Sequence, residues 1–205
     1  MNCCHETQCI FGKLNFVGHY FPLSVPDCSI TRAGRMFRTA LLRFKRGAAD
    51  EVTFEIIRRL GSWIRDLTAG AAGDWGFITC PASSEEIYQK RNEPLLSLLG
   101  NFIPELNILN HRIEYTGRKA SKTQGSNLTV VESGIFHLRA PVNTRNLIIF
   151  DDLVVTGRTM SQFAGLIKNR STERIVFCSL GRSEYGCNII RVPSGSIITG
   201  AAGGK

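Results

Sequence analysis

The chain has 205 residues, of which 43% are hydrophobic and 20% are charged, and these proportions are ordinary for a globular protein. This length predicts one domain with a sizeable core, and no apolar run approaches the roughly 18–20 residues that span a membrane. The first residues lack the pattern of a signal peptide, so we expect a cytoplasmic protein. The net charge of +8 predicts attraction to polyanions, either nucleic acid or a polyphosphate substrate.

Residues 1–33 are rich in cysteine, and we expect them to form a small N-terminal arm or hood. The whole chain has seven cysteines, an odd number that argues against a disulfide framework in the absence of a secretory signal. Four soft ligands could close a tetrahedral zinc site, and the candidates are Cys4, His5, Cys9 and Cys28. The segment contains no Cys-x-x-Cys pair, so free thiols on a loosely packed arm are the alternative.

Two amphipathic helices are predicted next. Over residues 34–46, apolar side chains share one face, and the opposite, basic face carries Arg35, Arg38, Arg43, Lys45 and Arg46. This basic face indicates either an ordinary solvated surface or contact with a phosphate-rich partner such as nucleic acid. We expect Asp50 to cap the second helix, which ends near residue 67 and buries a face formed by Val52, Ile56, Leu60, Trp63, Ile64 and Leu67.

The middle of the chain alternates between strand and helix patterns. Residues 75–80 predict the first strand of a sheet, and a turn of small residues follows at 81–84. A helix that carries Arg91 and several leucines comes next, and then a second strand over about residues 107–115. The stretch 116–127 is polar and basic without apolar periodicity, which predicts a mobile loop.

The last part of the chain contains two further strand patterns and a tail. Residues 134–138 predict another short strand, and residues 174–180 predict the last strand of the sheet. The tail from residue 193 to residue 205 lacks the pattern of a core segment, so we expect it to be disordered.

The most informative stretch is Asn146–Met160, with the sequence NLIIFDDLVVTGRTM. Its residues 147–150 are fully apolar and β-prone, which is typical of a buried parallel strand. Asp151 and Asp152 come at the carboxyl end of this run, where open α/β sheets bind their ligands. A polar turn then leads into a helix whose predicted buried face consists of Met160, Phe163, Leu166 and Ile167.

This stretch has the composition of a phosphate site. Backbone N–H groups at a helix N-terminus, together with the hydroxyls of Thr156 and Thr159, are suited to a phosphate monoester. Two alternatives are a Walker B strand and a buried strand that ends in two solvated aspartates. The first requires a G-x-x-x-x-G-K-[ST] loop, which the chain does not contain.

The same stretch resembles the 5-phosphoribosyl-1-pyrophosphate (PRPP) signature of type I phosphoribosyltransferases. The matching positions are Leu147–Phe150, Asp151, Asp152, Leu153, Val154, Thr156, Gly157 and Thr159, whereas Val155 stands where a threonine is common. Residues 34–183 are similar to the ComF-type, competence-associated branch of that family. The similar elements are Phe44-Lys45-Arg46-Gly47, Cys80-Pro81, Lys90-Arg91-Asn92, Arg118 to Gln124 and Ser179-Leu180-Gly181-Arg182.

The resemblance implies an α/β fold, with a central, mostly parallel sheet flanked by helices, over residues 34–192. It implies that Asp151 and Asp152 are catalytic and hold the ribose hydroxyls. The 5′-phosphate would lie against Val154, Val155, Thr156, Gly157, Arg158 and Thr159. Pyrophosphate would face Ala82, Ser83 and Arg91, with Arg118, Lys119 and Lys122 closing over it. Mg²⁺ would accompany PRPP as the cofactor.

The expected function is transfer of the phosphoribosyl group from PRPP to a nucleobase or another nitrogen acceptor. One alternative is a protein that binds PRPP or a nucleotide without catalysis. It is favoured by Leu128–Glu132, which replaces the arginine and asparagine that the family has after its basic loop. The other alternative is a ComF-like accessory of DNA uptake or processing, which would bind nucleic acid through the basic face of the helix at 35–46.

Overall fold

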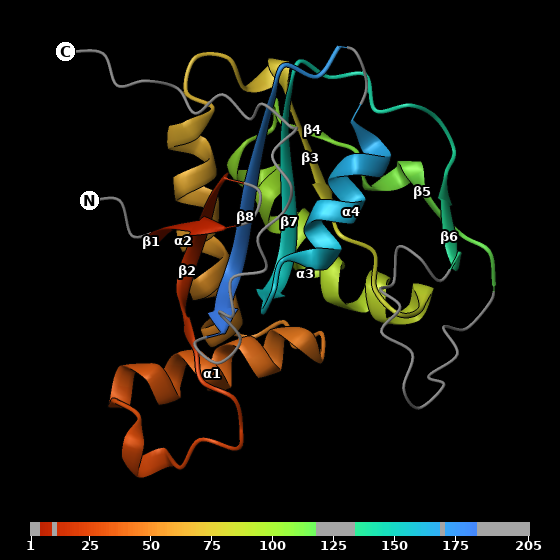
Figure 1. The fold of residues 1–205 in the computed structure, drawn as a ribbon. Coiled ribbons are helices and arrows are strands. Elements are labelled where there is room, and N and C mark those ends of the chain that lie inside the picture. The colour runs from red at the N-terminus through yellow and green to blue at the C-terminus, as the bar shows by residue number, and fades with distance from the viewer. Residues whose placement is uncertain (1–4, 10–11, 118–133, 169–170, 184–205) are drawn as a thin grey trace.

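The computed structural model describes residues 5–9, 12–117, 134–168 and 171–183 (Figure 1). Its elements, in chain order, are β1 (His5–Cys9), β2 (Gly12–Tyr20), α1 (Arg32–Lys45), α2 (Glu51–Leu67), β3 (Trp75–Thr79), α3 (Glu85–Phe102), β4 (Asn107–Ile108), β5 (Ile113–Tyr115), β6 (Phe136–Leu138), β7 (Asn146–Val154), α4 (Arg158–Ile167) and β8 (Arg174–Ser183). Among the described segments, no helix combines the length and the apolar content needed to cross a membrane.

A six-stranded sheet in the order β1-β2-β8-β7-β3-β4 forms the centre of the molecule. β1 and β2 pair antiparallel, whereas the pairs β2–β8, β8–β7, β7–β3 and β3–β4 are all parallel. β5 and β6 form a separate antiparallel pair. The predicted fold class is confirmed, because the central sheet is mostly parallel and is flanked by helices.

Helices cover both faces of the sheet and divide the apolar core into two clusters (Figure 1). On one face, α4 packs against the sheet through residues that include Met160 and Phe163. On the other face lie α1, α2 and most of α3, whose Tyr88 belongs to the first cluster. Because both faces are covered, a central strand can be apolar at consecutive positions, and Leu147–Phe150 of β7 are all fully buried.

The N-terminal segment contributes a strand to this sheet. β2 pairs in parallel with β8, with Leu14 opposite Phe177 and Phe16 opposite Ser179. Leu14 and Phe16 are 1% and 2% exposed and belong to the core on the α4 side of the sheet. The expectation of a loosely packed arm is therefore wrong for residues 12–20. The physical reason is that burial of these two side chains in the core stabilises the segment as a strand.

The two predicted N-terminal helices are present with boundaries close to those expected. The hydroxyl of Thr31 accepts a backbone N–H of α1 at 3.1 Å, and the carboxylate of Asp50 accepts one of α2 at 2.9 Å. Two predictions of burial are wrong, since Val52 of α2 is 45% exposed and Leu166 of α4 is 52% exposed. Their neighbours in the same turns, Thr53 and Ile167, are 0% and 2% exposed, so Val52 and Leu166 lie off the buried face of their helices.

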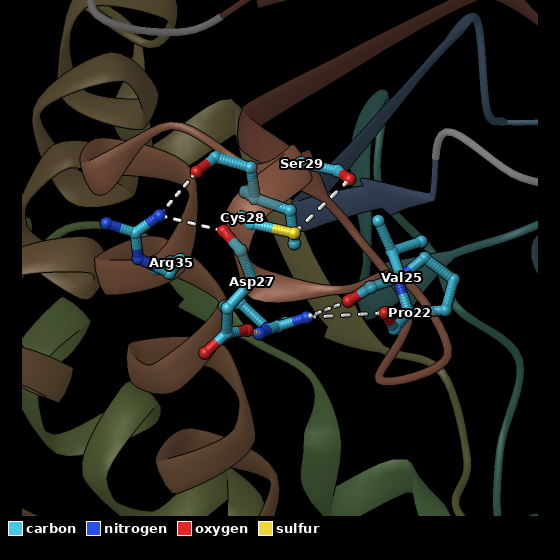
Figure 2. Close-up of polar contacts among 8 residues, drawn as sticks. Pro22, Val25, Asp27, Cys28, Ser29 and Arg35 are labelled. Atoms are coloured by element: carbon cyan, nitrogen blue, oxygen red, sulfur yellow. Dashed lines mark hydrogen bonds and ion pairs between the residues drawn. The ribbon is translucent and has the colours of Figure 1, made fainter.

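The basic face of α1 holds the loop that precedes the helix (Figure 2). Arg35 donates to the backbone carbonyl oxygen of Asp27 at 2.8 Å. Arg38 forms an ion pair with the Asp27 side chain and donates to the carbonyl oxygens of Pro22 and Val25 at 3.4 and 3.2 Å. Arg38 is 8% exposed, so its predicted place on a solvated face is wrong. The preceding loop covers it and supplies the acceptors that a buried guanidinium requires.

Several strands differ from their predicted extents. The stretch 107–115 is divided, because β4 joins the central sheet beside β3 whereas β5 pairs with β6. A 3-10 helix at Asn110–Arg112 lies between the two pieces. β7 is longer than predicted, since its pairing with β8 continues through Val154. Asp151 and Asp152 therefore lie inside the last part of the strand and not after it. The predicted domain boundaries at residues 33 and 192 stay predictions.

The place of β2 in the core can be tested by cavity formation. We expect Phe16→Ala to lower the free energy of unfolding by about 3–5 kcal/mol, the range for truncating a buried aromatic side chain. Urea titration measures this change. Leu23→Ala is the matched control, because Leu23 is 70% exposed and its truncation should change stability by less than about 0.5 kcal/mol. Similar small effects of both variants would contradict the packing of β2.

Candidate functional site

Two carboxylates lie at the position where this sheet changes the direction of its connections. β4 lies on the outer side of β3, and β8 lies on the outer side of β7, so the chain leaves these two central strands in opposite directions. In open α/β folds, ligands bind beyond the carboxyl ends of the strands at such a point. The two strands stay paired up to it, since the Cys80 amide donates to the Phe150 carbonyl oxygen at 2.7 Å. Asp151 and Asp152 follow Phe150 directly.

Asp152 is buried and is held by cations from two helices. Its carboxylate oxygen Oδ2 accepts a hydrogen bond from the Arg91 guanidinium of α3 at 3.2 Å, and it lies 3.7 Å from Nζ of Lys45 of α1. Asp152 is 4% exposed and Arg91 is 7% exposed. A buried charge without a partner costs several kcal/mol, so this geometry is what permits a carboxylate here. We call Lys45, Arg91, Asp151 and Asp152 the charged cluster.

Arg91 joins the end of β3 to the charged cluster. Its guanidinium donates to the Cys80 carbonyl oxygen at 3.0 Å as well as to Asp152. Burial acts to lower the pKa of Arg91, but the negative charges of Asp152 and Asp151 outweigh it and hold the pKa above its ordinary value. The guanidinium is thus directed inward. Its predicted contact with pyrophosphate stays a prediction, and such a contact would require this ion pair to rearrange.

The Asp151 carboxyl has a raised pKa. Burial raises the pKa of the Asp151 carboxyl to about 7, and the nearby Asp152 carboxylate adds to the increase. Arg91, Lys45 and the Asp152 amide act in the opposite direction, and this amide donates to Oδ1 of Asp151 at 2.9 Å. The two acids therefore have different environments. Asp152 is paired with two cations, whereas Asp151 can gain or release a proton near pH 7.

The turn after β7 leads into α4 through a glycine with a left-handed backbone. Gly157 is the N-cap residue of α4 and has a φ of +76°, which residues with a Cβ rarely adopt. The Thr156 hydroxyl accepts a long hydrogen bond from the Arg158 amide at 3.4 Å. The first N–H groups of an α-helix have no acceptor inside the helix, and they favour a bound anion. The predicted phosphate turn is therefore followed, as expected, by the N-terminus of a helix.

The predicted phosphate-site residues differ in their accessibility. Val155, Thr156 and Arg158 are exposed, and Thr159 is half-buried. Val154 and Gly157 are buried, and the Val154 side chain belongs to the apolar core on the α4 side. A phosphate could therefore meet hydroxyls and backbone groups here, while Val154 could contribute only its backbone. Val155 is 44% exposed, and it has no hydroxyl to offer at the position where the resembling family often has a threonine.

The loop after β3 is closed by a tyrosine. The Ala82 amide donates to the Tyr115 hydroxyl at 2.8 Å, and the same hydroxyl donates to the Ala82 carbonyl oxygen at 3.2 Å. Burial raises the pKa of Tyr115, so the phenol stays protonated and able to donate. Ser83 is half-buried, and Ser84 caps α3 by accepting the Ile87 amide at 3.3 Å. The predicted role of Ala82 and Ser83 in binding pyrophosphate stays a prediction, and an anion at the Ala82 amide would have to displace the phenol.

The site contains two residues that the sequence does not assign to it. The sequence pattern places Lys45 on the basic face of a helix, although the residue lies at the carboxylate pair. Tyr115 ends a short strand and gives no local signal of contact with the loop after β3. The signal available for Lys45 is its position in the Phe44–Gly47 element, which resembles the family but carries no information about its spatial neighbours.

Some predicted residues lie outside the described part of the chain. These are Arg118, Lys119 and Lys122 of the basic loop, Cys4 of the zinc hypothesis and the tail 193–205. His5 and Cys9 belong to β1, and Cys28 is an exposed free thiol beside Ser29. Within the described residues, no three His, Cys, Asp or Glu side chains are grouped closely enough to hold a metal ion. The zinc site stays a prediction.

Comparison with known proteins finds a likeness among solved structures. The chain matches no protein-family model and no curated protein. Among solved structures it is similar to a hypoxanthine phosphoribosyltransferase from Staphylococcus aureus, with 14% sequence identity and a TM-score of 0.41. The alignment covers 64% of this chain and 64% of that one, which is less than two thirds of either. This likeness is too weak to indicate a function, and similarity to the ComF-type branch stays a prediction.

The Arg91–Asp152 ion pair predicts that removing Arg91 alone costs more stability than removing both charges of the pair. We expect Arg91→Met to lower the free energy of unfolding by about 3 kcal/mol, because it leaves the Asp152 carboxylate buried without its main partner. It should also raise the pKa of Asp151 further, since a nearby cation is removed. The double variant Arg91→Met/Asp152→Asn should recover most of the lost stability. Urea titration and carbon-13 NMR of the carboxyl groups measure the two effects. No recovery in the double variant would contradict the pairing.

The raised pKa of Asp151 predicts how stability changes with pH. An aspartate in the unfolded chain has a pKa of about 3.9, whereas in the fold that of Asp151 is about 7. Between these values the unfolded chain has released the proton that the folded protein keeps, so stability decreases as pH rises. The free energy of unfolding of Asp151→Asn should therefore increase relative to that of the wild type as pH rises from about 4 to about 7, by at most about 1.4 kcal/mol per pH unit. A constant difference over this range would contradict the assignment.

Proposed function

We propose that this protein binds PRPP with Mg²⁺ and transfers its phosphoribosyl group to a nitrogen acceptor, such as a nucleobase. The observation that carries the proposal is the position of the two carboxylates, at the carboxyl end of β7 where the sheet reverses its connections. β7 ends at Val154, and α4 begins at Arg158 after the turn through Gly157. Only a short turn therefore separates the two acids from the start of a helix.

This arrangement fits a ligand that carries a phosphate next to a ribose. A phosphate at the start of α4 would meet backbone N–H groups and the Thr156 and Thr159 hydroxyls. The ribose would then lie over the carboxylates, which can accept hydrogen bonds from its hydroxyl groups. Asp151 and Asp152 are adjacent in β7, so neighbouring hydroxyls could each find an acceptor.

The different environments of the two acids suit the proposed transfer. In that reaction the bond between ribose C1 and the pyrophosphate oxygen breaks, and its electron pair leaves with pyrophosphate. A bond forms between C1 and the acceptor nitrogen, whose proton has to be removed. Asp151, with a pKa of about 7, is suited to take this proton at neutral pH. The Asp152 carboxylate, paired with Arg91 and Lys45, would face the positive charge that develops on the ribose and stabilise it.

The residues fit Mg²⁺ only when it arrives with its ligand. Carboxylate oxygens are ligands that Mg²⁺ accepts, but Oδ2 of Asp152 is already engaged by Arg91 and Lys45. No cluster of three or more ligating side chains is found within the described ranges. Diphosphate oxygens and water would therefore have to complete the coordination of the ion, and the bound ion would offset the charge of the leaving group.

A second candidate function is a protein that binds PRPP or a nucleotide without turnover. It is favoured by the internal contacts of two predicted pyrophosphate ligands, since the Ala82 amide is bonded to Tyr115 and Arg91 is bonded to Asp152. A DNA-processing role is not favoured by the contacts of α1. Its Arg35, Arg38 and Arg43 are engaged with acceptors of the same chain.

The proposal is tested by calorimetric titration of PRPP with Mg²⁺ into the wild type and into Asp151→Asn. We expect micromolar binding by the wild type and at least a tenfold loss in the variant, because a carboxylate that accepts ribose hydroxyls is removed. Asp66→Asn is the control, since Asp66 is an exposed acid of α2. Release of pyrophosphate on addition of nucleobases then separates an enzyme from a binding protein. No binding by the folded wild type would overturn both candidates.

A further inference from the structure

The C-terminal end of α1 is fixed against the strand that carries the two acids. Phe44 is fully buried, and its ring meets that of Phe150 edge to face, with 6.4 Å between the centroids. Phe150 is the residue directly before Asp151. The contact therefore holds α1 at the level of the carboxylates, and Lys45 is the next residue along the helix.

A second contact fixes the same end of α1 against α3. Gly47 has a φ of +74°, and a Cβ on it would lie only 2.8 Å from the Lys90 carbonyl oxygen. Its amide donates to the Phe44 carbonyl oxygen at 2.8 Å and ends the helix. Lys90 directly precedes Arg91, so the end of α1 and the Arg91 segment are packed together. These two contacts explain how a lysine so far away in sequence reaches Asp152.

Lys45 and Arg91 share one oxygen of Asp152 but differ in accessibility. The Arg91 side chain is 8% exposed and makes the shorter contact, at 3.2 Å. The Lys45 side chain is 41% exposed, and its ammonium lies 3.7 Å from the oxygen. An ion pair with a partly exposed lysine contributes little to stability, and the flexible lysine stem allows the ammonium to move. Asp152 keeps its buried partner if Lys45 turns toward a ligand.

The position of Lys45 relative to α4 indicates which part of a ligand it would meet. α4 packs on one face of the sheet, whereas α1 packs on the other. A phosphate at the start of α4 and the ammonium of Lys45 would thus lie on opposite sides of the carboxylate pair. We propose that Lys45 is a substrate-binding residue that contacts the diphosphate of PRPP. This inference rests on the proposed function.

The test compares two ligands that share the 5′-phosphate and the ribose. PRPP carries the diphosphate, whereas ribose 5-phosphate does not. We expect Lys45→Met to weaken the binding of PRPP with Mg²⁺ roughly tenfold and that of ribose 5-phosphate by less than about twofold. Arg46→Met is the matched control, because Arg46 is the adjacent exposed cation and should affect neither ligand. Calorimetric titration measures all of these affinities, and Lys45→Gln provides a second variant if Lys45→Met does not fold.

The outcomes separate this inference from the proposed function. Equal weakening of both ligands would overturn the inference, because Lys45 would then act by positioning Asp152. Unchanged binding of PRPP would also overturn it while leaving the proposed function intact. If the wild type binds no PRPP, the proposed function is overturned and the inference with it.

Discussion

The burial of Asp152 is the constraint on which the site depends. A carboxylate that is 4% exposed needs compensating charge, and Arg91 supplies it from α3. The same guanidinium is bonded to the Cys80 carbonyl oxygen, so the end of β3 and the end of β7 share one partner. Lys45 adds a contact from α1. One buried anion therefore links the ends of two central strands to α3, and the contact with Lys45 extends this link to α1.

This constraint makes two adjacent, chemically identical residues different. Asp152 is surrounded by cations, whereas burial of the Asp151 carboxyl beside that negative charge raises its pKa to about 7. When two neighbouring acids have different surroundings, one can keep a fixed charge while the other transfers a proton. The separation arises here from which helices reach which face of β7, and neither residue type encodes it.

The part of the site that can be predicted is the part that is local in sequence. The apolar run of β7, its two acids and the Gly157 turn into α4 are continuous, so propensity and periodicity are sufficient to predict them. The inward direction of Arg91 is not predictable in this way, because its partner lies 61 residues away and only tertiary packing brings them together. β2 is not predicted for a similar reason, because its stability depends on pairing with the distant strand β8. The cysteines around it also form the more conspicuous sequence pattern.

The parallel pairing of β2 with β8 has a consequence for biosynthesis. The side-chain amide of Asn15 donates to the Phe177 carbonyl oxygen at 3.3 Å across 162 positions of sequence. A growing chain therefore carries β2 without this neighbour until β8 has been synthesised, and the apolar side chains of Leu14 and Phe16 lack their final cover over that interval. Closing so long a loop is slow and entropically unfavourable. The nascent chain is consequently most exposed to aggregation or chaperone capture until β8 leaves the ribosome and completes the sheet.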